Sequence, residues 1–295
     1  DWRKRKPQLR MPRPMMSTSV RAGDSFFDTQ GRWRRLPAGD GYRVALRDDH
    51  PYFSHHRVRG WKVLPGVVYL ELALSAVARS RPDFNTCFVD EVVWLRPVLA
   101  NTPETEIDVQ LAPISPTRIE FRIEHGGEMC GGGVLNAQAV SGRADPLATP
   151  LCVRSQVGAE TRDHFPRSEV YAAFADMGIV YGPYFQRISY VQRLSNKALS
   201  WLSNYAGVSL GWAGLLDCAF QTSMAISIGE RRESLMPYSL GRLTLHQALP
   251  EQALGSACVL TEKLSPFRTN LTVFDEAYTP LLSVFDLGVK PSHLQ

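Results

Sequence analysis

The chain has 295 residues, of which 44% are hydrophobic and 21% charged, and its net charge is +4. This balance is typical of a globular protein with a sizeable core. The sequence has no uncharged run of 18 residues and no apolar run at its N-terminus, which argues against a membrane helix and a signal peptide. We therefore expect a soluble, cytoplasmic protein with no membrane partner.

The positive charge is concentrated at the start of the chain. Residues 1–36 hold ten Lys or Arg against three acidic residues, which leaves about −3 for the rest. The Pro-broken sequence WRKRKPQLRMPRP predicts a solvated linker over residues 1–40, with a docking or polyanion-binding role as the alternative. A nucleic-acid interface would need basic and aromatic residues interleaved on a folded face, so no nucleic-acid partner is expected. Because the chain starts at Asp rather than Met, we expect it to be a piece of a longer protein.

The cysteines are odd in number and include no CxxC pair. The sequence therefore predicts neither a disulfide framework nor a zinc site. The five cysteines are Cys87, Cys130, Cys152, Cys218 and Cys258.

The first half of the chain, residues 41–145, predicts one buried helix followed by an antiparallel sheet. The segment YRVALR alternates as a strand does, and residues 66–78 are apolar almost all round, which indicates a buried helix. Strand-like runs follow, with a hairpin turn at residues 125–127. The glycines at 131–133 are followed by neither Lys-Ser/Thr nor a helix, so they favour a bulge or a close backbone approach over a phosphate cradle.

The second half repeats this outline. Residues 146–166 predict a polar linker, and residues 168–177 predict a helix that starts at Ser168 and ends before Gly178. Strand-like runs then flank a second nearly apolar helix, GWAGLLDCAFQTSMAISI. A sheet curled around a central helix is the hot-dog arrangement, so the outline predicts an α+β double hot-dog fold, with residues 167–295 as its C-terminal half.

The segment HRVRGWKVLP brings a histidine to the entrance of the first buried helix. His56 can take or give a proton near neutral pH, because the ordinary pKa of histidine is about 6.5. Gly60 permits a tight reversal, and Pro65 suits the first turn of a helix, where its missing N–H would be unpaired in any case. The segment indicates a proton-transfer residue, with a structural or surface histidine as the alternative.

In the second apolar helix, Asp217 and Gln221 are four residues apart and share one face. Burial raises the pKa of a carboxyl group and keeps part of it protonated near neutral pH, which a general acid requires. Gln221 is spaced to orient that carboxyl group. The alternative is an Asp217 that lies partly exposed on the polar edge of the helix.

Three more polar residues allow more than one interpretation. Tyr181, held beside Gly182 and Pro183, could donate a hydrogen bond from a rigid corner, or it could be an ordinary buried Tyr with a satisfied hydroxyl. Glu71 in the first helix is interpreted as structural. His55 stands beside His56, and the pattern alone does not define its role.

Three segments resemble the motifs of one known family. HRVRGWKVLPG matches the HxxxGxxxxP signature of dehydratase domains from modular polyketide synthases, the trans-acyltransferase type being one candidate source. GIVYGPYFQ resembles the family's GxxYGPxF motif, and DCAFQ resembles its DxxxQ/H motif. All three occur in the family's order, and residues 237–250 are also similar, so the likeness covers residues 41–291.

The resemblance implies a hydro-lyase of polyketide and antibiotic biosynthesis, which removes water from a 3-hydroxyacyl thioester to leave a 2-enoyl thioester. His56 would be the base that removes the C2 proton. Asp217 would be the acid that protonates the departing 3-hydroxyl, with Gln221 orienting it.

The resemblance also implies that Tyr181 binds near the substrate hydroxyl and that Gly182 and Pro65 belong to the residues that bind or orient the substrate. The amide of Gly66, at the helix start after Pro65, would stabilise the thioester oxygen as charge develops. No metal or bound cofactor is implied, only the phosphopantetheine arm of an acyl carrier protein. Further partners implied are neighbouring synthase domains and a second copy in a homodimer.

One residue departs from the family pattern, because His55 stands where an acidic residue often precedes the catalytic histidine. This departure concerns the local hydrogen bonding rather than the role of His56. Pro65, Asp217 and Gln221 are all present, which favours plain dehydration. The alternatives are a dehydratase-like isomerase or cyclase and an inactive scaffold that docks the carrier protein.

Overall fold

The structure is a computed structural model. It describes residues 32–37, 39–137, 163–203, 211–229, 235–246 and 256–291.

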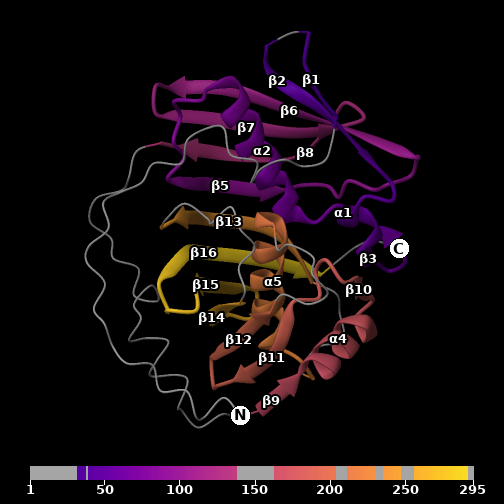
Figure 1. The fold of residues 1–295 in the computed structure, drawn as a ribbon, viewed down its shortest axis with the longest axis vertical. Helices are drawn as coiled ribbons and strands as arrows, with labels where there is room; N and C mark the ends of the chain where they lie inside the picture. Colours follow the sequence, from indigo (N-terminus) through magenta and orange to yellow (C-terminus); the bar gives the residue numbers. More distant parts are fainter. Residues whose placement is uncertain are drawn as a thin grey trace.

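Within these residues, thirteen strands form one continuous antiparallel sheet that spans both halves of the chain (Figure 1). The strands of the first half, in spatial order, are β1 (Arg32–Arg35), β2 (Asp40–Arg47), β6 (Glu104–Ser115), β7 (Arg118–His125), β8 (Glu128–Asn136) and β5 (Phe88–Trp94). Those of the second half are β13 (Leu235–Leu245), β16 (Pro280–Pro291), β15 (Arg268–Phe274), β14 (Ser256–Ser265), β12 (Lys197–Ser203), β11 (Ile188–Arg193) and β9 (Asp163–Pro166).

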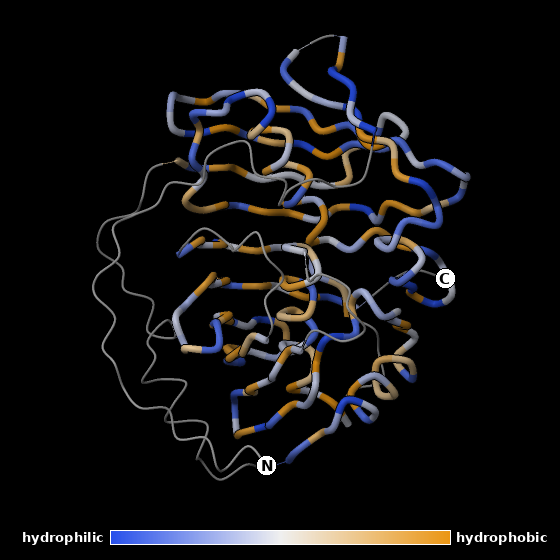
Figure 2. Tube along the Cα trace, viewed as in Figure 1, coloured by the Kyte–Doolittle hydropathy of each residue, from blue (hydrophilic) through white to orange (hydrophobic). Residues whose placement is uncertain are grey.

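Each half packs its sheet against one long helix. Helix α2 (Gly66–Ser80) serves the first half and α5 (Trp212–Ala225) the second, and both are buried over most of their length (Figure 1). Strand β6 alternates buried and exposed residues, as expected when one face of a sheet covers a core. Figure 2 shows the apolar residues following these central strands and helices. The predicted double hot-dog arrangement is confirmed.

The sheets of the two halves join edge to edge. Strand β5 of the first half pairs with β13 of the second, with Ser239 opposite Val93. At the same seam the Arg242 guanidinium donates to both carboxylate oxygens of Asp90, at 2.7 and 3.2 Å. A bidentate pair of this kind fixes strand register as well as position.

The glycine-rich turn and strand behave as predicted. The β7–β8 hairpin turns at Gly126 and Gly127, whose φ angles of 62° and 81° suit glycine. In β8, a Cβ on Gly131 would lie 2.7 Å from the carbonyl oxygen of Val93 and 3.0 Å from the Tyr69 ring. The close backbone approach predicted for residues 131–133 therefore lets α2 sit against the sheet.

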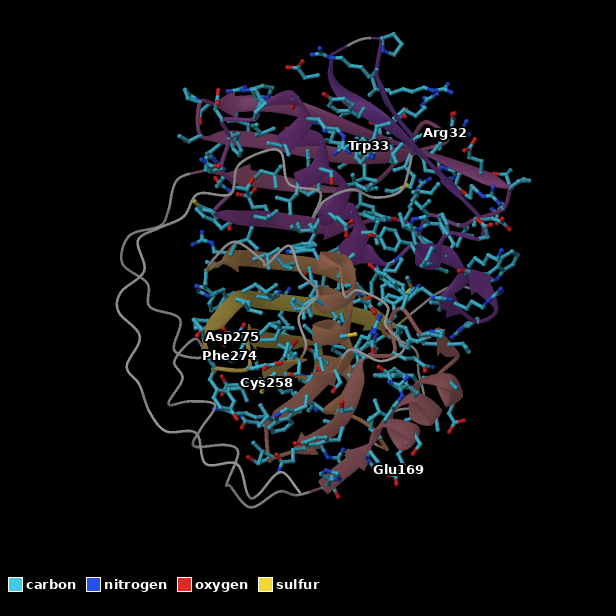
Figure 3. The ribbon with its side chains drawn as sticks, in the orientation of Figure 1. Arg32, Trp33, Glu169, Cys258, Phe274 and Asp275 are labelled. Atoms are coloured by element: carbon cyan, nitrogen blue, oxygen red, sulfur yellow. The ribbon has the colours of Figure 1, made fainter. Side chains whose placement is uncertain are left out.

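Two short edge strands lie inside segments that the sequence assigned to linkers. Strand β1 falls within predicted linker 1–40, and β9 within predicted linker 146–166. Edge strands are held by main-chain ladders with one open side, so they need little apolar patterning. Trp33 of β1 stacks against the guanidinium of Arg79 from α2; Figure 3 labels Trp33 and Arg32. Residues 1–31 and 138–162 of the predicted linkers and first half lie outside the described residues.

Three short elements complete the chain around the site. Helix α4 (Arg167–Asp176) starts one residue earlier than predicted and ends just before Gly178, whose φ is 83°. Helix α1 (Pro51–Ser54) was not predicted. A separate small sheet has the order β10 (Ile179–Tyr181), β3 (His56–Val58) and β4 (Trp61–Lys62).

Candidate active site

The small sheet places His56 opposite Tyr181. Strand β3 comes from the first half and β10 from the second, and their register pairs these two residues directly. The turn from β3 to β4 uses Arg59 and Gly60, whose φ angles are 50° and 85°. The tight reversal predicted at Gly60 is confirmed, and it returns the chain to Val63 beside the histidine ring.

The His56 ring is fixed as a neutral base. Its Nδ1 lies 2.8 Å from the carbonyl oxygen of Val63, which can only accept, so Nδ1 carries the hydrogen and Nε2 is the basic nitrogen. The rings of Tyr181 and Phe185 lie 5.5 and 5.9 Å from the imidazole, centre to centre. Burial lowers the pKa of His56 to about 4, against a smaller raising effect of the Val63 hydrogen bond.

Asp217 is buried as a weak acid on α5. Burial raises the pKa of its carboxyl group to about 7, and the hydrogen bond from Gln221 opposes part of that rise. The Gln221 side-chain amide donates to Oδ2 of Asp217 at 2.8 Å. No hydrogen bond from a described residue reaches Oδ1, so this oxygen is available to carry the proton of the neutral acid.

Further hydrogen bonds fix the side chain of Gln221. Its amide nitrogen also donates to the carbonyl oxygen of Phe185 at 3.0 Å, and its oxygen accepts from the Tyr171 hydroxyl at 3.2 Å. Tyr171 also accepts from the backbone N–H of Ile188 at 3.0 Å. Tyr171 was not predicted, since its position beside Val170 in α4 indicates only an ordinary packing residue.

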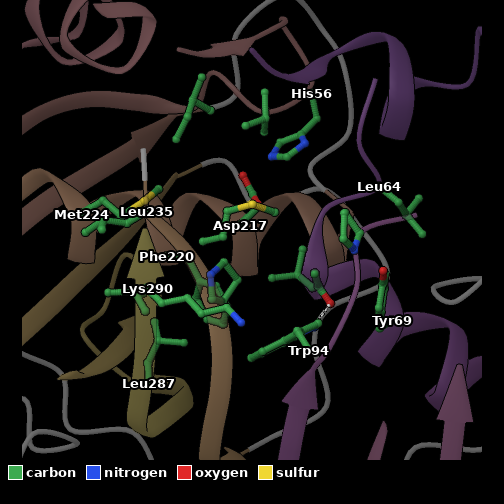
Figure 4. Close-up of a pocket in the computed structure, with 18 of the residues that line it drawn as sticks. His56, Leu64, Tyr69, Trp94, Asp217, Phe220, Met224, Leu235, Leu287 and Lys290 are labelled. Atoms are coloured by element: carbon green, nitrogen blue, oxygen red, sulfur yellow. Dashed lines mark hydrogen bonds between the residues drawn. The ribbon is translucent and has the colours of Figure 1, made fainter. Parts of the chain in front are cut away.

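A cavity of about 250 Å³ joins the histidine and the aspartate. Figure 4 shows the His56 imidazole and the Asp217 carboxyl group pointing into the same space from opposite sides. The first helix adds Gly66 and Val67, and Lys290 and Arg96 lie on the wall as exposed cations. The rest of the wall is mainly apolar, formed by Val58, Leu64, Tyr69, Trp94, Leu95, Pro97, Ile179, Tyr181, Phe220, Met224, Leu235, Met236, Pro237, Leu287, Val289 and Pro291.

The start of α2 supplies backbone donors to this cavity. The first N–H groups of a helix have no partner within the helix and carry partial positive charge. Gly66 is the first helical residue, after Pro65 as N-cap, and lines the cavity while Pro65 does not. The indole of Trp94 donates to the Gly66 carbonyl oxygen at 2.8 Å and fixes this turn. A Cβ on Gly66 would lie 2.8 Å from that indole nitrogen.

Tyr181 lines the cavity, whereas Gly182 does not. The Tyr181 hydroxyl makes no hydrogen bond to another described residue, and burial raises its pKa, so it stays a neutral donor. Gly182 contacts His55 instead: its N–H donates to the His55 carbonyl oxygen at 2.8 Å, and a Cβ would lie 2.5 Å from the His55 ring. Gly182 therefore supports the corner after Tyr181 rather than the cavity wall.

His55 is a hydrogen-bond acceptor for the turn after Tyr181. Its Nδ1 accepts from the backbone N–H of Tyr184 at 3.3 Å. His55 thus holds the GPYF turn, which places the Phe185 ring against the His56 ring. A hydrogen-bonding role was left open by the sequence, and the structure shows this one.

Two other features are absent from the described residues. No cluster of three or more His, Cys, Asp or Glu that could bind a metal occurs in this part of the chain. Among its helices, none has the length and apolarity needed to cross a membrane.

Comparison with family models identifies the chain. A model described as polyketide synthase dehydratase domain matches residues 37–125, and one described as polyketide synthase dehydratase N-terminal domain matches residues 152–293. The chain belongs to the polyketide synthase dehydratase domains. Dehydration is the activity of this family, so the resemblance seen in the three motifs is confirmed.

Curated relatives and solved structures agree. The chain is 30% identical to polyketide synthase ThaG of Burkholderia thailandensis over 80% of its own length, and 28% identical to PksN of Bacillus subtilis over 66%; each match spans about 4% of the synthase. A trans-AT synthase dehydratase domain from Brevibacillus brevis aligns with a TM-score of 0.75 and 21% identity, over 89% of this chain and 97% of that one. The dehydratase domain of the curacin CurF module aligns at 0.73 and 20%, over 89% and 98%. These structures support the double hot-dog fold.

Proposed function

We propose that this domain removes water from a 3-hydroxyacyl thioester carried on an acyl carrier protein, and that His56 and Asp217 are its catalytic residues. The observation that supports these roles most strongly is the meeting of a neutral imidazole and a carboxyl group with a raised pKa, about 7, in one apolar cavity. With these pKa values, His56 is neutral near pH 7 and a large part of Asp217 is protonated, which are the states that the reaction requires.

In the proposed reaction, Nε2 of His56 takes the C2 proton and the C2–C3 double bond forms. The thioester oxygen gains negative charge, which the N–H groups at the start of α2, led by Gly66, stabilise. The C3–O bond breaks as Asp217 gives its proton to the hydroxyl, and water leaves. Tyr181 donates to the same hydroxyl and holds it toward Asp217.

The pKa values also explain how the site resets. After one turnover His56 is protonated and Asp217 is ionised. Because the pKa of Asp217 (about 7) is higher than that of His56 (about 4), the proton returns to the carboxylate. The pair is thereby ready for the next substrate without any other reactant.

The cavity wall suits a substrate on a phosphopantetheine arm. It is apolar along the path proposed for the acyl chain, and it carries two cations that suit a phosphodiester: Lys290 and Arg96, the latter also paired with Glu128. Family membership supports neighbouring synthase domains, a homodimer and a cytoplasmic location, and the Brevibacillus neighbour supports a trans-acyltransferase synthase. Plain dehydration is preferred over isomerisation or cyclisation because Asp217, Gln221 and Pro65 are all retained.

The test is turnover of a 3-hydroxyacyl pantetheine thioester by the purified domain, followed by mass and absorbance of the 2-enoyl product. We expect His56→Ala and Asp217→Asn each to lose about 10²- to 10⁴-fold in kcat. His125→Ala and Asp286→Asn, the same kinds of change outside the cavity, should keep full activity. Unchanged turnover in either cavity variant would contradict the assignment. A shifted double bond or a ring would support the isomerase or cyclase, and carrier binding without turnover the scaffold.

A further inference from the structure

Glu71 is a buried carboxyl group that the proposed reaction does not use. It lies on α2, does not line the cavity, and is only 3% exposed. Its Oε1 accepts from the Tyr52 hydroxyl at 2.7 Å, and its Oε2 accepts from the backbone N–H of Ala213 at 3.1 Å. Burial raises its pKa to about 7, against the lowering effect of these two hydrogen bonds.

The Ala213 contact caps the helix that carries Asp217. Helix α5 begins after Gly211, which has no side chain with which to cap it. Its first N–H groups need acceptors, and a carboxylate also complements the positive end of the helix dipole. Glu71, 142 residues earlier in the chain, provides that acceptor from the other half of the protein.

One carboxyl group therefore touches three elements of the site. Glu71 shares α2 with Gly66, the first residue of the helix, which lines the cavity. Its Tyr52 contact holds α1, the segment that leads into His56. Its Ala213 contact holds the first turn of α5, one turn before Asp217.

We infer that Glu71 is a positioning residue, which sets the spacing of the base, the amide donors and the acid by tying α1, α2 and α5 together. This inference rests on the proposed roles of His56 and Asp217. A misplacement of about 1 Å at reacting groups can cost about 10²-fold in rate. The tie thus acts on the rate of the chemical step more than on substrate binding.

The opposite end of α5 is held differently. The guanidinium of Arg193 donates to the carbonyl oxygens of Ile226 and Ile228, at 3.3 and 2.7 Å, and pairs with Asp163. All of these residues belong to the second half. The Arg193 contacts anchor α5 within its own sheet, whereas the Glu71 contact aligns it with α2.

The experiment compares two substitutions of Glu71 with a matched control on α5. Glu71→Gln keeps an oxygen that can accept from Ala213, and the Tyr52 hydroxyl can turn to accept from the new amide. Glu71→Leu keeps the volume but removes both hydrogen bonds. The control, Thr222→Val, removes buried hydrogen bonds of α5 to Ser200 and to its own backbone, away from the cavity.

We expect Glu71→Leu to lose at least tenfold in kcat with KM changed less than threefold, while Glu71→Gln stays within threefold of the parent in kcat. Thr222→Val should lower the melting temperature at least as much as Glu71→Leu and yet keep its kcat. A loss of kcat in Glu71→Leu no greater than that in Thr222→Val would overturn the inference. So would a Gln variant as impaired as the Leu variant.

Hydrogen exchange gives a readout that does not depend on turnover. In Glu71→Leu, the peptide covering residues 212–217 should exchange faster than in the parent, and in Glu71→Gln it should stay protected. Unchanged exchange in the Leu variant would overturn the inference even if the domain is a dehydratase. Conversely, failure of the His56 and Asp217 variants to lose turnover would refute the proposed reaction while leaving the exchange result intact.

Discussion

The two halves place a carboxyl group at the same point of their central helices. Glu71 is the sixth residue of α2 and Asp217 the sixth residue of α5. Both are buried, and burial raises the pKa of each to about 7. They differ in what surrounds their oxygens. Each oxygen of Glu71 accepts one hydrogen bond from the protein, whereas Asp217 accepts one from Gln221 and directs its other oxygen toward the cavity.

This difference shows that a raised pKa does not by itself identify a catalytic acid. A carboxyl group whose two oxygens are both engaged by the protein can order its surroundings but cannot reach a substrate. A carboxyl group with one oxygen directed at a cavity, as we propose for Asp217, can instead donate its proton to a bound substrate. In the proposed mechanism, the first helix contributes backbone donors and the positioning carboxyl group of Glu71, and the second contributes the acid and part of the apolar wall.

The same isosteric change in each helix tests most directly whether the two carboxyl groups have different roles. We expect Asp217→Asn to remove about 10²- to 10⁴-fold of kcat, because an amide cannot supply the proton. Glu71→Gln should cost less than threefold. Single-turnover measurements of product formation check both, and equal losses would mean that the two carboxyl groups do not have different roles.

The pH dependence of turnover also distinguishes Asp217 from Glu71. Dehydration needs Asp217 protonated and His56 neutral. Because the pKa of Asp217 is about 7, kcat/KM should fall about tenfold per pH unit above that value. Because the pKa of His56 is about 4, the rate should be nearly flat between pH 5 and 6. Glu71→Gln should retain the alkaline limb; its disappearance would assign that limb to Glu71.

The smallest effect concerns the glycines where the two helices begin. A Cβ on Gly66 would lie 2.8 Å from the Trp94 indole, and one on Gly211 would lie 2.7 Å from the Tyr184 hydroxyl. A packed indole ring can move aside for an added methyl group less easily than the end of a Tyr side chain can. We expect Gly66→Ala to cost about 1–3 kcal/mol in the free energy of unfolding, and Gly211→Ala to cost less. Urea denaturation monitored by Trp fluorescence measures both, and a larger cost at Gly211 would reverse the ranking.

The sequence predicted those parts of the site that follow local rules. Helical spacing placed Gln221 beside Asp217, and the glycine and proline of HRVRGWKVLP located a turn and a helix start around His56. The two helices and most central strands followed from apolar patterning. These signals lie within a few residues of the feature that they predict.

The parts that escaped prediction depend on contacts between distant segments. Tyr171 binds Gln221 from another helix, 50 residues away, and no local pattern connects them. Glu71 was interpreted as structural, but its partner at the start of α5 could not be inferred from α2 alone. Strands β1 and β9 escaped because edge pairing uses the backbone, whose hydrogen bonds leave little trace in side-chain composition.

The small sheet that carries His56 has a consequence for how activity develops during folding. Its strand β3 comes from one half and β10 from the other, so the histidine gains its neighbour Tyr181 only after a pairing between remote segments. Non-local pairings of this kind close large loops and form slowly. A chain with only one half folded would then be inactive. The rate at which turnover appears after dilution from denaturant would report this long-range step of folding.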